Sequence, residues 1–404
     1  MKESYFLKDI IEKPITGEWG TEGDNVNVLR TTNFTNEGKL KTKEVVQRNI
    51  DRRKIDKKKL QHGDIIIEKS GGSPTQPVGR VVYFNLTGEY LCNNFTSILR
   101  PKQEIVYPKY LLYILFAYHN YGLTSAFQNK TTGIINLQLG RYIANLRIPL
   151  PPLPTQKKIA AILDEADKIR QLNKQLIQKY DELTQSLFLD MFGDPVTNPK
   201  GWDVITIVDL VRKDKWSLKR GPFGGALKKE IFVDEGYLVY EQYHALNNDF
   251  TFERYYIDET KFQELIAFEV KSGDIIVSCS GVYLGKLAVI PEGAKKGIIN
   301  QALLKISLNE HKMRNDFFLF HFTQKNFKET FFESNRGAGI PNFPPMSDFK
   351  KFPFIYPPIH LQNQFAKRVQ AIEAQKTQAQ SALQKSEDLF NSLLQRAFKG
   401  ELVV

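Results

Sequence analysis

Apolar side chains alternate three and four residues apart along residues 155–191, and a second, less regular apolar stripe follows residues 360–397. This spacing keeps them on one face of an α-helix, and a repeat sustained over about four heptads is typical of a coiled coil. Thr155 can cap the first helix, and Gly193 followed by Pro195 can end it. The predicted seam comprises Ile159, Ile162, Ala166, Ile169, Asn173, Leu176, Tyr180, Leu183 and Leu187 in the first helix, and Phe365, Ile372, Ala379, Leu383, Phe390, Leu393 and Ala397 in the second.

We expect the two helices to pair with each other, because an apolar stripe on a long helix needs a partner. Antiparallel pairing is favoured over parallel pairing, since the long intervening sequence can return the chain to the far end. Asn173 falls at a core position of the seam, where a buried amide can fix the register of a coiled coil at a cost in stability. The alternative is that this stretch is solvated or covered by another subunit.

The two helical stretches are copies of one plan, and the repeat continues outside them. Gln156 in the first helix matches Gln362 in the second, and the sequence GDII occurs at 63–66 and again at 273–276. The segment 219–227 has no obvious counterpart in the first copy. Further matched positions are Pro151 and Pro152 with Pro357 and Pro358, Gly79 and Arg80 with Gly285 and Lys286, Asn94 with Asn300, and Gly133, Ile134 and Asn136 with Gly339, Ile340 and Asn342.

The repeat predicts a tandem duplication of a globular unit followed by a long helix. Short apolar runs bounded by Gly, Asn, Asp or Pro indicate strands and turns, and the apolar run 110–118 indicates a buried helix. We therefore predict an α+β fold, with two mixed α/β domains in a pseudo-two-fold tandem repeat, separated by an antiparallel two-helix coiled coil. The predicted segments are residues 1–153 and 194–358 for the domains, and 154–193 and 359–404 for the helices.

The composition indicates the class of binding partner and the cellular compartment. The formal net charge of +11 suggests a polyanionic partner such as nucleic acid, although basic proteins without one are common. The two cysteines cannot form a disulfide framework, which fits a reducing cytoplasm. The apolar run 110–118 is shorter than a membrane span, and the N-terminus lacks the pattern of a signal peptide, so that we expect a cytoplasmic protein with no membrane partner.

Catalytic groups are harder to find. The segment 198–202 (NPKGW) has lysine where an adenine methyltransferase loop needs its second proline, and the glycines of 221–225 lack the Gly-Lys-Ser/Thr of a phosphate-binding loop. The six histidines show no paired ligand spacing, so that no metal site is predicted. We expect no intrinsic active site and no cofactor on this chain.

The candidates for DNA contact are basic and polar loops that recur at equivalent places in the two copies, together with the segment 219–227 and the strand ends at Arg30 and Tyr240. Small residues let the backbone approach phosphates, while Arg, Gln and Asn can read base edges. Each loop could instead be structural, and the basic run 48–59 could be a solvated face. The candidate DNA-binding residues are Arg30, Lys69, Ser70, Arg80, Lys130, Thr131, Thr132 and Gln138 in the first copy, and Lys219, Arg220, Tyr240, Gln242, Ser280, Tyr283, Lys286 and Arg336 in the second.

The duplicated plan resembles the specificity subunit of type I restriction-modification enzymes. The resemblance lies in PLPPLPTQKKIA at 149–160, MFGDPVTNPKGW at 191–202, the paired GDII strands and PPIHLQNQ at 357–364, and it spans nearly the whole chain. One departure is His360 and Leu361 before Gln362, where related chains often place an acidic residue before the glutamine.

The resemblance implies two target recognition domains that bind the halves of a split double-stranded DNA sequence, with the helix pair setting the gap. It implies methyltransferase and restriction subunits as partners, which would carry the S-adenosylmethionine, ATP and Mg²⁺. Two other classes stay open: a self-sufficient DNA-modifying enzyme, and a protein scaffold that functions through its coiled coil alone.

Overall fold

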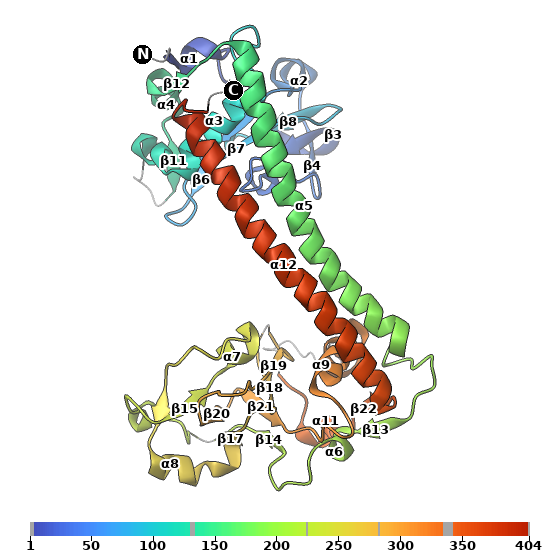
Figure 1. The fold of residues 1–404 in the computed structure, drawn as a ribbon. Coiled ribbons are helices and arrows are strands. Elements are labelled where there is room, and N and C mark those ends of the chain that lie inside the picture. Colours follow the sequence, from blue (N-terminus) through green and yellow to red (C-terminus); the bar gives the residue numbers. More distant parts are fainter. Residues whose placement is uncertain (1–3, 130–133, 224, 282, 334–341, 403–404) are drawn as a thin grey trace. The chain divides into compact units, whose positions relative to one another are not determined.

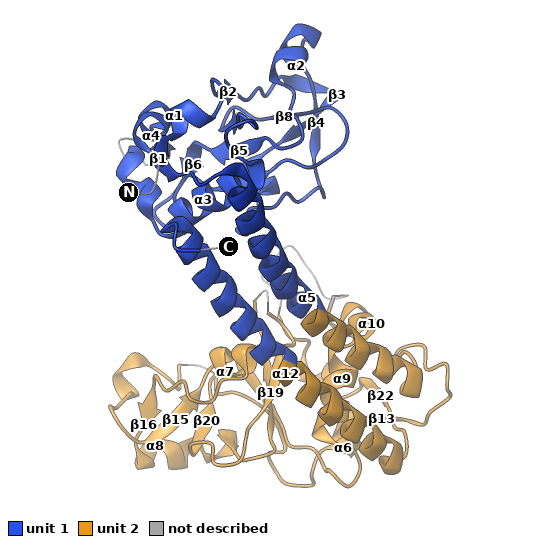
Figure 2. Ribbon diagram, turned by 45° about the horizontal axis from the view of Figure 1, so that its top comes forward, with its two compact units in different colours: residues 1–175, 379–404 blue, residues 176–378 orange. Residues whose placement is uncertain are grey.

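The chain folds into two compact units in the computed structural model, which describes residues 4–129, 134–223, 225–281, 283–333 and 342–402. Unit 1 comprises Met1–Gln175 and Ala379–Val404, and unit 2 comprises Leu176–Gln378 (Figure 2). The division cuts both long helices, so that each unit contains one globular segment and half of each helix. No helix in the described ranges is both long and apolar enough to span a membrane.

Two helices of 40 residues follow the two globular segments: α5 (Leu153–Phe192) and α12 (Ile359–Phe398) (Figure 1). In unit 1 the Asn173 Nδ2 group donates to Ser386 Oγ at 3.3 Å, and the Arg170 guanidinium lies 4.3 Å from the Phe390 ring centroid. Lower residue numbers on α5 therefore lie opposite higher residue numbers on α12. The prediction of antiparallel pairing is confirmed here, and Asn173 faces the partner helix.

The same direction of pairing holds in unit 2. Lys376 Nζ lies 2.5 Å from Asp181 Oδ1, and the rings of Phe188 and Phe365 are 5.7 Å apart. Because an increase in residue number along α5 corresponds to a decrease along α12, the helices are antiparallel in this unit as well.

The predicted seam of α5 is wrong at three positions. Ile169, Leu176 and Leu183 are 47%, 40% and 50% exposed, whereas the buried α5 side chains in the two units are those of Gln156, Ile159, Ala160, Leu163, Ala166, Asp167, Arg170, Thr184, Phe188 and Phe192. α5 has two apolar stripes, and the buried one contains polar residues that a hydrophobic pattern does not count. Ile162 and Leu187 are half-buried.

None of the predicted seam residues of α12 is exposed. Phe365, Ala379, Phe390 and Ala397 are buried, and Ile372, Leu383 and Leu393 are half-buried.

Unit 1 is a mixed α/β module built from small sheets. The strands are β1 (Ser4–Phe6), β2 (Ile15–Thr16), β3 (Thr21–Leu29), β4 (Val46–Asn49), β5 (Ile65–Glu68), β6 (Ser70–Gly72), β7 (Val81–Tyr83), β8 (Tyr90–Cys92), β9 (Thr96–Leu99), β10 (Gln128–Asn129), β11 (Ile135–Leu137) and β12 (Arg147–Pro149). They form sheets of order β2-β9-β5-β7, β4-β3-β8, β10-β11-β6 and β1-β12, and only the pair β3–β8 is parallel among the described strands. The shorter helices are α1 (Leu7–Ile10), α2 (Arg52–Lys58), α3 (Pro108–Asn120) and α4 (Leu139–Asn145), with 3-10 turns η1 (Thr31–Asn33) and η2 (Leu123–Phe127).

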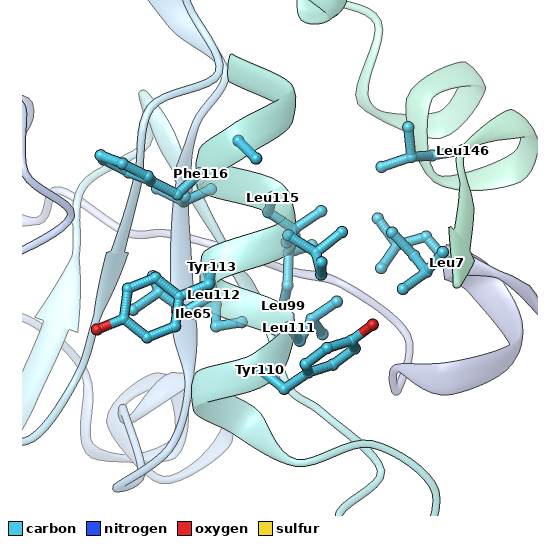
Figure 3. Packing of buried hydrophobic residues seen from close by; sticks show 14 of the residues in the cluster. Leu7, Ile65, Leu99, Tyr110, Leu111, Leu112, Tyr113, Leu115, Phe116 and Leu146 are labelled. Carbon is cyan, nitrogen blue, oxygen red and sulfur yellow. The ribbon is translucent and has the colours of Figure 1, made fainter. Parts of the chain in front are cut away.

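Helix α3 forms the centre of the unit 1 core. Its residues 110–117 are all buried, which confirms the predicted buried helix. Leu111 and Leu115 belong to one apolar cluster with Ile65, Leu99 and Leu7 (Figure 3).

Unit 2 repeats this plan with different loops. Its strands are β13 (Val204–Thr206), β14 (Leu218–Arg220), β15 (Tyr237–Tyr240), β16 (Tyr256–Ile257), β17 (Glu269–Val270), β18 (Ile275–Ser278), β19 (Leu287–Val289), β20 (Gly297–Ile299), β21 (Leu303–Ile306) and β22 (Pro353–Ile355). The sheets have the orders β14-β21-β18-β19, β16-β15-β20-β17 and β13-β22, and β15–β20 is the parallel pair. The helical elements are α6 (Ile207–Leu210), η3 (Lys229–Ile231), α7 (Gln242–Asn247), α8 (Glu259–Glu264), η4 (Ile266–Phe268), α9 (Asn315–Thr323), α10 (Lys325–Lys328), the π-helical turn η5 (Glu329–Glu333) and α11 (Met346–Phe349).

Phenylalanine dominates the core of unit 2 around α9. The ring of Phe317 lies 4.8 Å from that of Phe192 at the end of α5, and the ring of Phe320 lies 5.1 Å from that of Phe365 on α12. These contacts fix the halves of both long helices that belong to this unit against its globular segment.

A buried glutamine joins each long helix to its module and confirms the repeat. The Gln156 side chain accepts from Tyr107 N and donates to the carbonyls of Ile105 and Pro151. In unit 2 the Gln362 side chain likewise accepts from Arg314 N and donates to the carbonyls of Lys312 and Pro357. The fold is therefore α+β, a tandem pair of mixed modules with an antiparallel pair of long helices, as predicted.

The backbone corrects two details of the predicted repeat. Asn93 rather than Asn94 matches Asn300, because these two residues donate their N–H groups to the equivalent carbonyls of Leu29 and Tyr240, both at 2.9 Å. Gly221 also has a counterpart, Gly17.

The two glycines share a steric environment. A Cβ added to Gly17 would lie 2.0 Å from Asn93 O, and one added to Gly221 would lie 1.8 Å from Asn300 O. Only glycine permits this close approach of two backbones.

Candidate nucleic-acid interface

The candidate residues Lys69, Ser70 and Arg80 of unit 1 meet where β5 ends. Glu68 exchanges backbone hydrogen bonds with Gly79 and Arg80, and Lys69 N donates to Phe95 O at 2.9 Å. Leu137 N donates to Lys69 O at 2.8 Å, and the Ser70 hydroxyl hydrogen-bonds the Asn136 side chain. The structure therefore brings together three of the loops that the repeat selected.

Unit 2 builds the same frame from other side chains. Ser278 N donates to Lys286 O at 2.7 Å, and Cys279 N donates to Ala302 O at 2.8 Å. Phe343 N donates to Cys279 O at 2.9 Å. Candidate residues Ser280, Tyr283 and Lys286 thus occupy the places that correspond to Ser70 and its neighbours in unit 1.

The charge at this place differs between the units. Arg80 makes a bidentate ion pair with Glu68, with Nε–Oε2 at 2.8 Å and Nη2–Oε1 at 3.1 Å, and only 7% of the Glu68 side chain is exposed. In unit 2 serine replaces the glutamate. The exposed Lys286 has no ion pair with any described residue, so that this site carries a net positive charge that the Glu68–Arg80 pair lacks.

Gln242 is held by the same frame in unit 2. Its Nε2 donates to Ser278 Oγ and Ser280 O, both at 2.9 Å, and lies 3.2 Å from Ser280 Oγ. This fixes the amide plane of a residue type that can read a base edge.

Tyr240 does not lie on a surface. Its side chain is fully buried, its hydroxyl donates to Lys295 O at 2.5 Å, and burial raises its pKa to about 12. The prediction that Tyr240 contacts DNA is therefore wrong, because the strand Tyr237–Tyr240 is covered on both faces over its last three residues.

Lys219 and Arg220 lie on β14 and are half-buried. The Lys219 ammonium is 5.2 Å from the Phe268 ring centroid, and the Arg220 guanidinium lies 5.6 Å from the Phe223 ring and 5.9 Å from the Phe343 ring. Phe223 is itself 68% exposed, so that a cation and an aromatic face lie together at this edge of unit 2.

The environments of Arg30, Lys69, Gln138 and Tyr283 differ. Arg30 precedes η1 and donates to Glu44 O at 3.4 Å, burial lowers the pKa of Lys69, and Gln138 and Tyr283 are exposed. The candidates Lys130, Thr131, Thr132 and Arg336 lie outside the described residues.

Several cations of the basic run 48–59 are paired. Arg52 pairs with Glu89 at 2.7 Å, and Lys54 and Lys58 pair with Glu18 at 3.1 and 2.7 Å. These contacts favour the structural interpretation of helix α2 over phosphate contact.

Groups suited to catalysis are few in the described residues. Burial raises the thiol pKa to about 11 for Cys92 and about 12 for Cys279, and lowers the pKa of His321 to about 3. The described part of the chain contains no cluster of three or more His, Cys, Asp or Glu that could hold a metal ion. A hollow of about 260 Å³ beside Arg80 and His119 lies below the roughly 300–1,000 Å³ of typical ligand pockets, and an open hollow of about 620 Å³ beside Lys109 and Asp164 lies within that range.

Sequence reasoning missed the turns that adjoin these loops, Asn93–Phe95 in unit 1 and Asn300–Ala302 in unit 2. The repeated asparagine was the available signal, but an alignment one residue out of register hid the correspondence of the residues that follow it.

Two modules with one backbone frame and different loop side chains define a class of protein built from a tandem repeat of one domain. Comparison with known families identifies the particular family. A model described as "Type I restriction modification DNA specificity domain" matches residues 2–180 and again 199–385, and the chain belongs to this family. It is accordingly a DNA target-recognition subunit rather than an enzyme.

Relatives and solved structures agree. The chain is 23% identical over 384 residues to the type I restriction enzyme MjaX specificity subunit of Methanocaldococcus jannaschii, covering 91% of this chain and 85% of that one. It is 25% identical over 252 residues to the MjaVIII specificity subunit of the same organism, covering 57% and 55%.

Two solved structures share the fold at 15% identity. One, from work on complex assembly and conformational transition of the type I restriction-modification system, has a TM-score of 0.62 and covers 99% of this chain and 98% of that one. The other is the S subunit of a type I system from M. genitalium, with a TM-score of 0.50 and coverage of 98% and 96%.

Proposed function

We propose that each unit reads one half of a split double-stranded DNA target, and that the chain brings methyltransferase and restriction subunits to that target. The observation that carries the proposal is the repeated loop frame with different side chains. Glu68 and Arg80 in unit 1 are replaced by Ser278 and Lys286 in unit 2 on the same backbone. Two copies of one reader with different contact groups suit two different half-sites.

Selection from a random duplex pool tests this proposal. The expected result is a motif of two half-sites with a degenerate gap, whose affinity falls steeply with salt, because phosphate contacts release counterions. Lys286→Ala should weaken binding about uniformly and reduce the salt slope by about 1, since the site loses one unpaired cation. A single continuous motif, or binding that salt does not change, would contradict the proposal.

The exposed apolar stripe of α5 is the proposed docking face for a methyltransferase subunit. Ile169 and Leu172 in unit 1 are 47% and 54% exposed, and Leu176 and Leu183 in unit 2 are 40% and 50% exposed. Contiguous exposed apolar patches mark interaction sites, and a docked subunit would cover these side chains. S-adenosylmethionine, ATP and Mg²⁺ would then belong to the partner subunits, and the assembly would act in the cytoplasm.

Leu172→Gln tests the docking face, because glutamine keeps helix propensity while removing the apolar contact. We expect the variant to lose co-purification with the methyltransferase subunit and to keep the melting temperature of the parent chain. Val208→Gln, at a 51% exposed residue of the globular part of unit 2, is the matched control. Equal retention of the partner by both variants would rule out this face.

A further inference from the structure

In each module an exposed turn follows the second strand of the parallel pair. The turn leads to the next strand of the chain, which belongs to a different sheet. In unit 1 the turn joins β8 to β9, and in unit 2 it joins β20 to β21. Both turns touch the candidate loops, because Lys69 N donates to Phe95 O and Cys279 N donates to Ala302 O.

The first asparagine of each turn has a structural role. The Thr96 N–H donates to Asn93 O at 3.0 Å, and the Leu303 N–H donates to Asn300 O at 3.1 Å. The Asn93 side chain accepts from the Thr96 hydroxyl at 3.3 Å, and that of Asn300 accepts from Ala302 N at 3.1 Å. Gly17 and Gly221 pack against these turns where no Cβ fits, so that the backbone is held in one conformation in both copies.

The next residue presents an unused amide. Asn94 and Gln301 follow the structural asparagines and are both exposed. Neither side chain has a hydrogen-bond partner among the residues that the structure describes. The residue after each amide is apolar: Phe95 is 47% exposed, and Ala302 is half-buried.

This pairing of residue types matches the edges of A·T pairs. Asn and Gln form two hydrogen bonds with the N6 and N7 atoms of adenine in the major groove, and Phe and Ala contact the 5-methyl group of thymine. The turns themselves contain no cation, so that a phosphate contact made by Asn94 or Gln301 would lack the attraction between opposite charges. Lys69, whose N–H donates to Phe95 O, lies beside the first turn and can supply a positive charge there.

We propose that the two turns are base-reading elements, in which Asn94 and Gln301 each recognise one adenine in their own half-site, and Phe95 contacts a neighbouring thymine methyl group. This inference rests on the proposed function and names the contacts within it. The rigid turn supplies the positioning, and the residue that follows the structural asparagine supplies the specificity.

The experiment uses the full chain co-purified with its methyltransferase subunits and selection from a random duplex pool. Asn94→Ala should relax one adenine position in one half-site, and Gln301→Ala should relax one adenine position in the other half-site. Phe95→Ala should relax a thymine position next to the one lost in Asn94→Ala. Val208→Ala is the control for an exposed apolar residue outside the turns, and it should change neither half-site.

Base analogues then test the chemistry. With 7-deazaadenine at the position relaxed in Asn94→Ala, which removes the N7 acceptor, wild-type affinity should fall about fivefold or more while the variant is unaffected. With uracil at the thymine position relaxed in Phe95→Ala, wild-type affinity should fall about fourfold, as expected for one buried methyl group, and Phe95→Ala should be insensitive.

The outcomes separate the inference from the function beneath it. If the wild type selects two half-sites but the alanine variants keep its profile, or weaken binding equally at every position, the turns do not read bases and the proposed function stands. If Asn94→Ala and Gln301→Ala alter the same half-site, the inference is also wrong. If the wild type selects no split motif, the proposed function fails and this inference fails with it.

Discussion

Asp167 on α5 is held between two cations in unit 1. Its Oδ1 accepts from Arg170 Nη2 at 2.5 Å, its Oδ2 pairs with Lys39, and only 8% of its side chain is exposed. Burial alone would raise the pKa of this carboxyl, but the hydrogen bonds from Lys39 and Arg170 outweigh burial and hold the pKa below its ordinary value of 3.8. Loop 35–39 of the module is thereby bonded to the long helix, since Glu37 also pairs with Lys174 at 2.5 Å.

Asp167→Asn should lower the free energy of unfolding at pH 7 by about 1.5–3 kcal/mol, the usual contribution of hydrogen bonds to a charged group. Because the folded-state pKa is depressed, the stabilisation is present above the unfolded value near 3.9 and is lost as pH falls through the lower folded value. The difference between wild type and variant should therefore shrink as the pH falls below about 4, as measured by urea unfolding.

Glu165→Gln is the matched control, because its carboxylate is 70% exposed and pairs only loosely with Lys168 at 3.5 Å. Its effect should stay within about 0.5 kcal/mol at every pH. A pH dependence in the control equal to that of Asp167→Asn would show that the buried pair is not its source.

Single residues mark the limit of what the sequence could predict about the site. The repeat correctly joined the loops after Gly63 and Gly273, but it could not show that Arg80 is committed to Glu68, twelve residues earlier along the hairpin. Tyr240 was likewise chosen as a DNA-contact candidate although its side chain is buried. A short strand that is buried on both faces has no alternation of apolar and polar residues, so that its sequence does not reveal the burial. Contact with bases depends on such local pairings, which the sequence alone does not contain.

Elements were easier to predict than contacts. Both long helices, their antiparallel pairing and the buried helix α3 follow from apolar spacing and length. The face of α5 did not follow, because Arg170 and Thr184 are buried while Ile169 and Leu183 are exposed. A hydrophobic pattern identifies a stripe, and where a helix has two stripes it cannot tell which one packs within the chain.

The joint between module and helix gives a prediction for each unit. Gln156→Ala should destabilise unit 1 by about 1–3 kcal/mol, because Tyr107 N and the carbonyls of Ile105 and Pro151 lose their partner in a buried setting. Gln362→Ala should do the same in unit 2, where the glutamine is fully buried. Urea unfolding monitored by tryptophan fluorescence and circular dichroism measures both changes.

Gln175→Ala, at an exposed position of the same helix, controls for the loss of a glutamine and should change stability by less than about 0.5 kcal/mol. Gln156→Glu keeps an acceptor for Tyr107 N but turns a buried carboxylate oxygen toward the carbonyls of Ile105 and Pro151, so that it should destabilise unit 1 at pH 7 at least as much as alanine does. Full recovery by glutamate would mean that the carbonyl contacts contribute nothing.

At the scale of the whole molecule, duplication accounts for most of the features that the two units share. The glutamine joints, the glycines at 17 and 221 and the backbone frame around β5 and β18 recur, whereas the contact side chains differ. A frame that is kept while its loops diverge allows each module to change its target independently. The sequence predicted this organisation because a repeat can be recognised from residue identities alone, without knowing how the side chains pack.

The two long helices, each 40 residues, are the segments through which one module is connected to the other, so the proposed function makes them the ruler of the target gap. Deleting residues 176–182 and 376–382 removes one heptad from each helix, and it removes Lys376 and Asp181, which pair with each other, together. At 1.5 Å per residue the loss is about 10 Å, or roughly three base pairs at 3.4 Å each. Binding-site selection should return both half-sites unchanged with a gap shortened by that amount.

Deletion of either heptad alone provides the control. It would take Lys376 or Asp181 from its partner and displace the rest of one stripe along the other helix, so that this variant should lose stability and bind DNA poorly. The double deletion keeps the two helices in step, because seven residues are about two helical turns on each. If the double deletion folds, binds DNA and keeps the original gap, the helices do not set the spacing, and the half-sites must be positioned by the partner subunits instead.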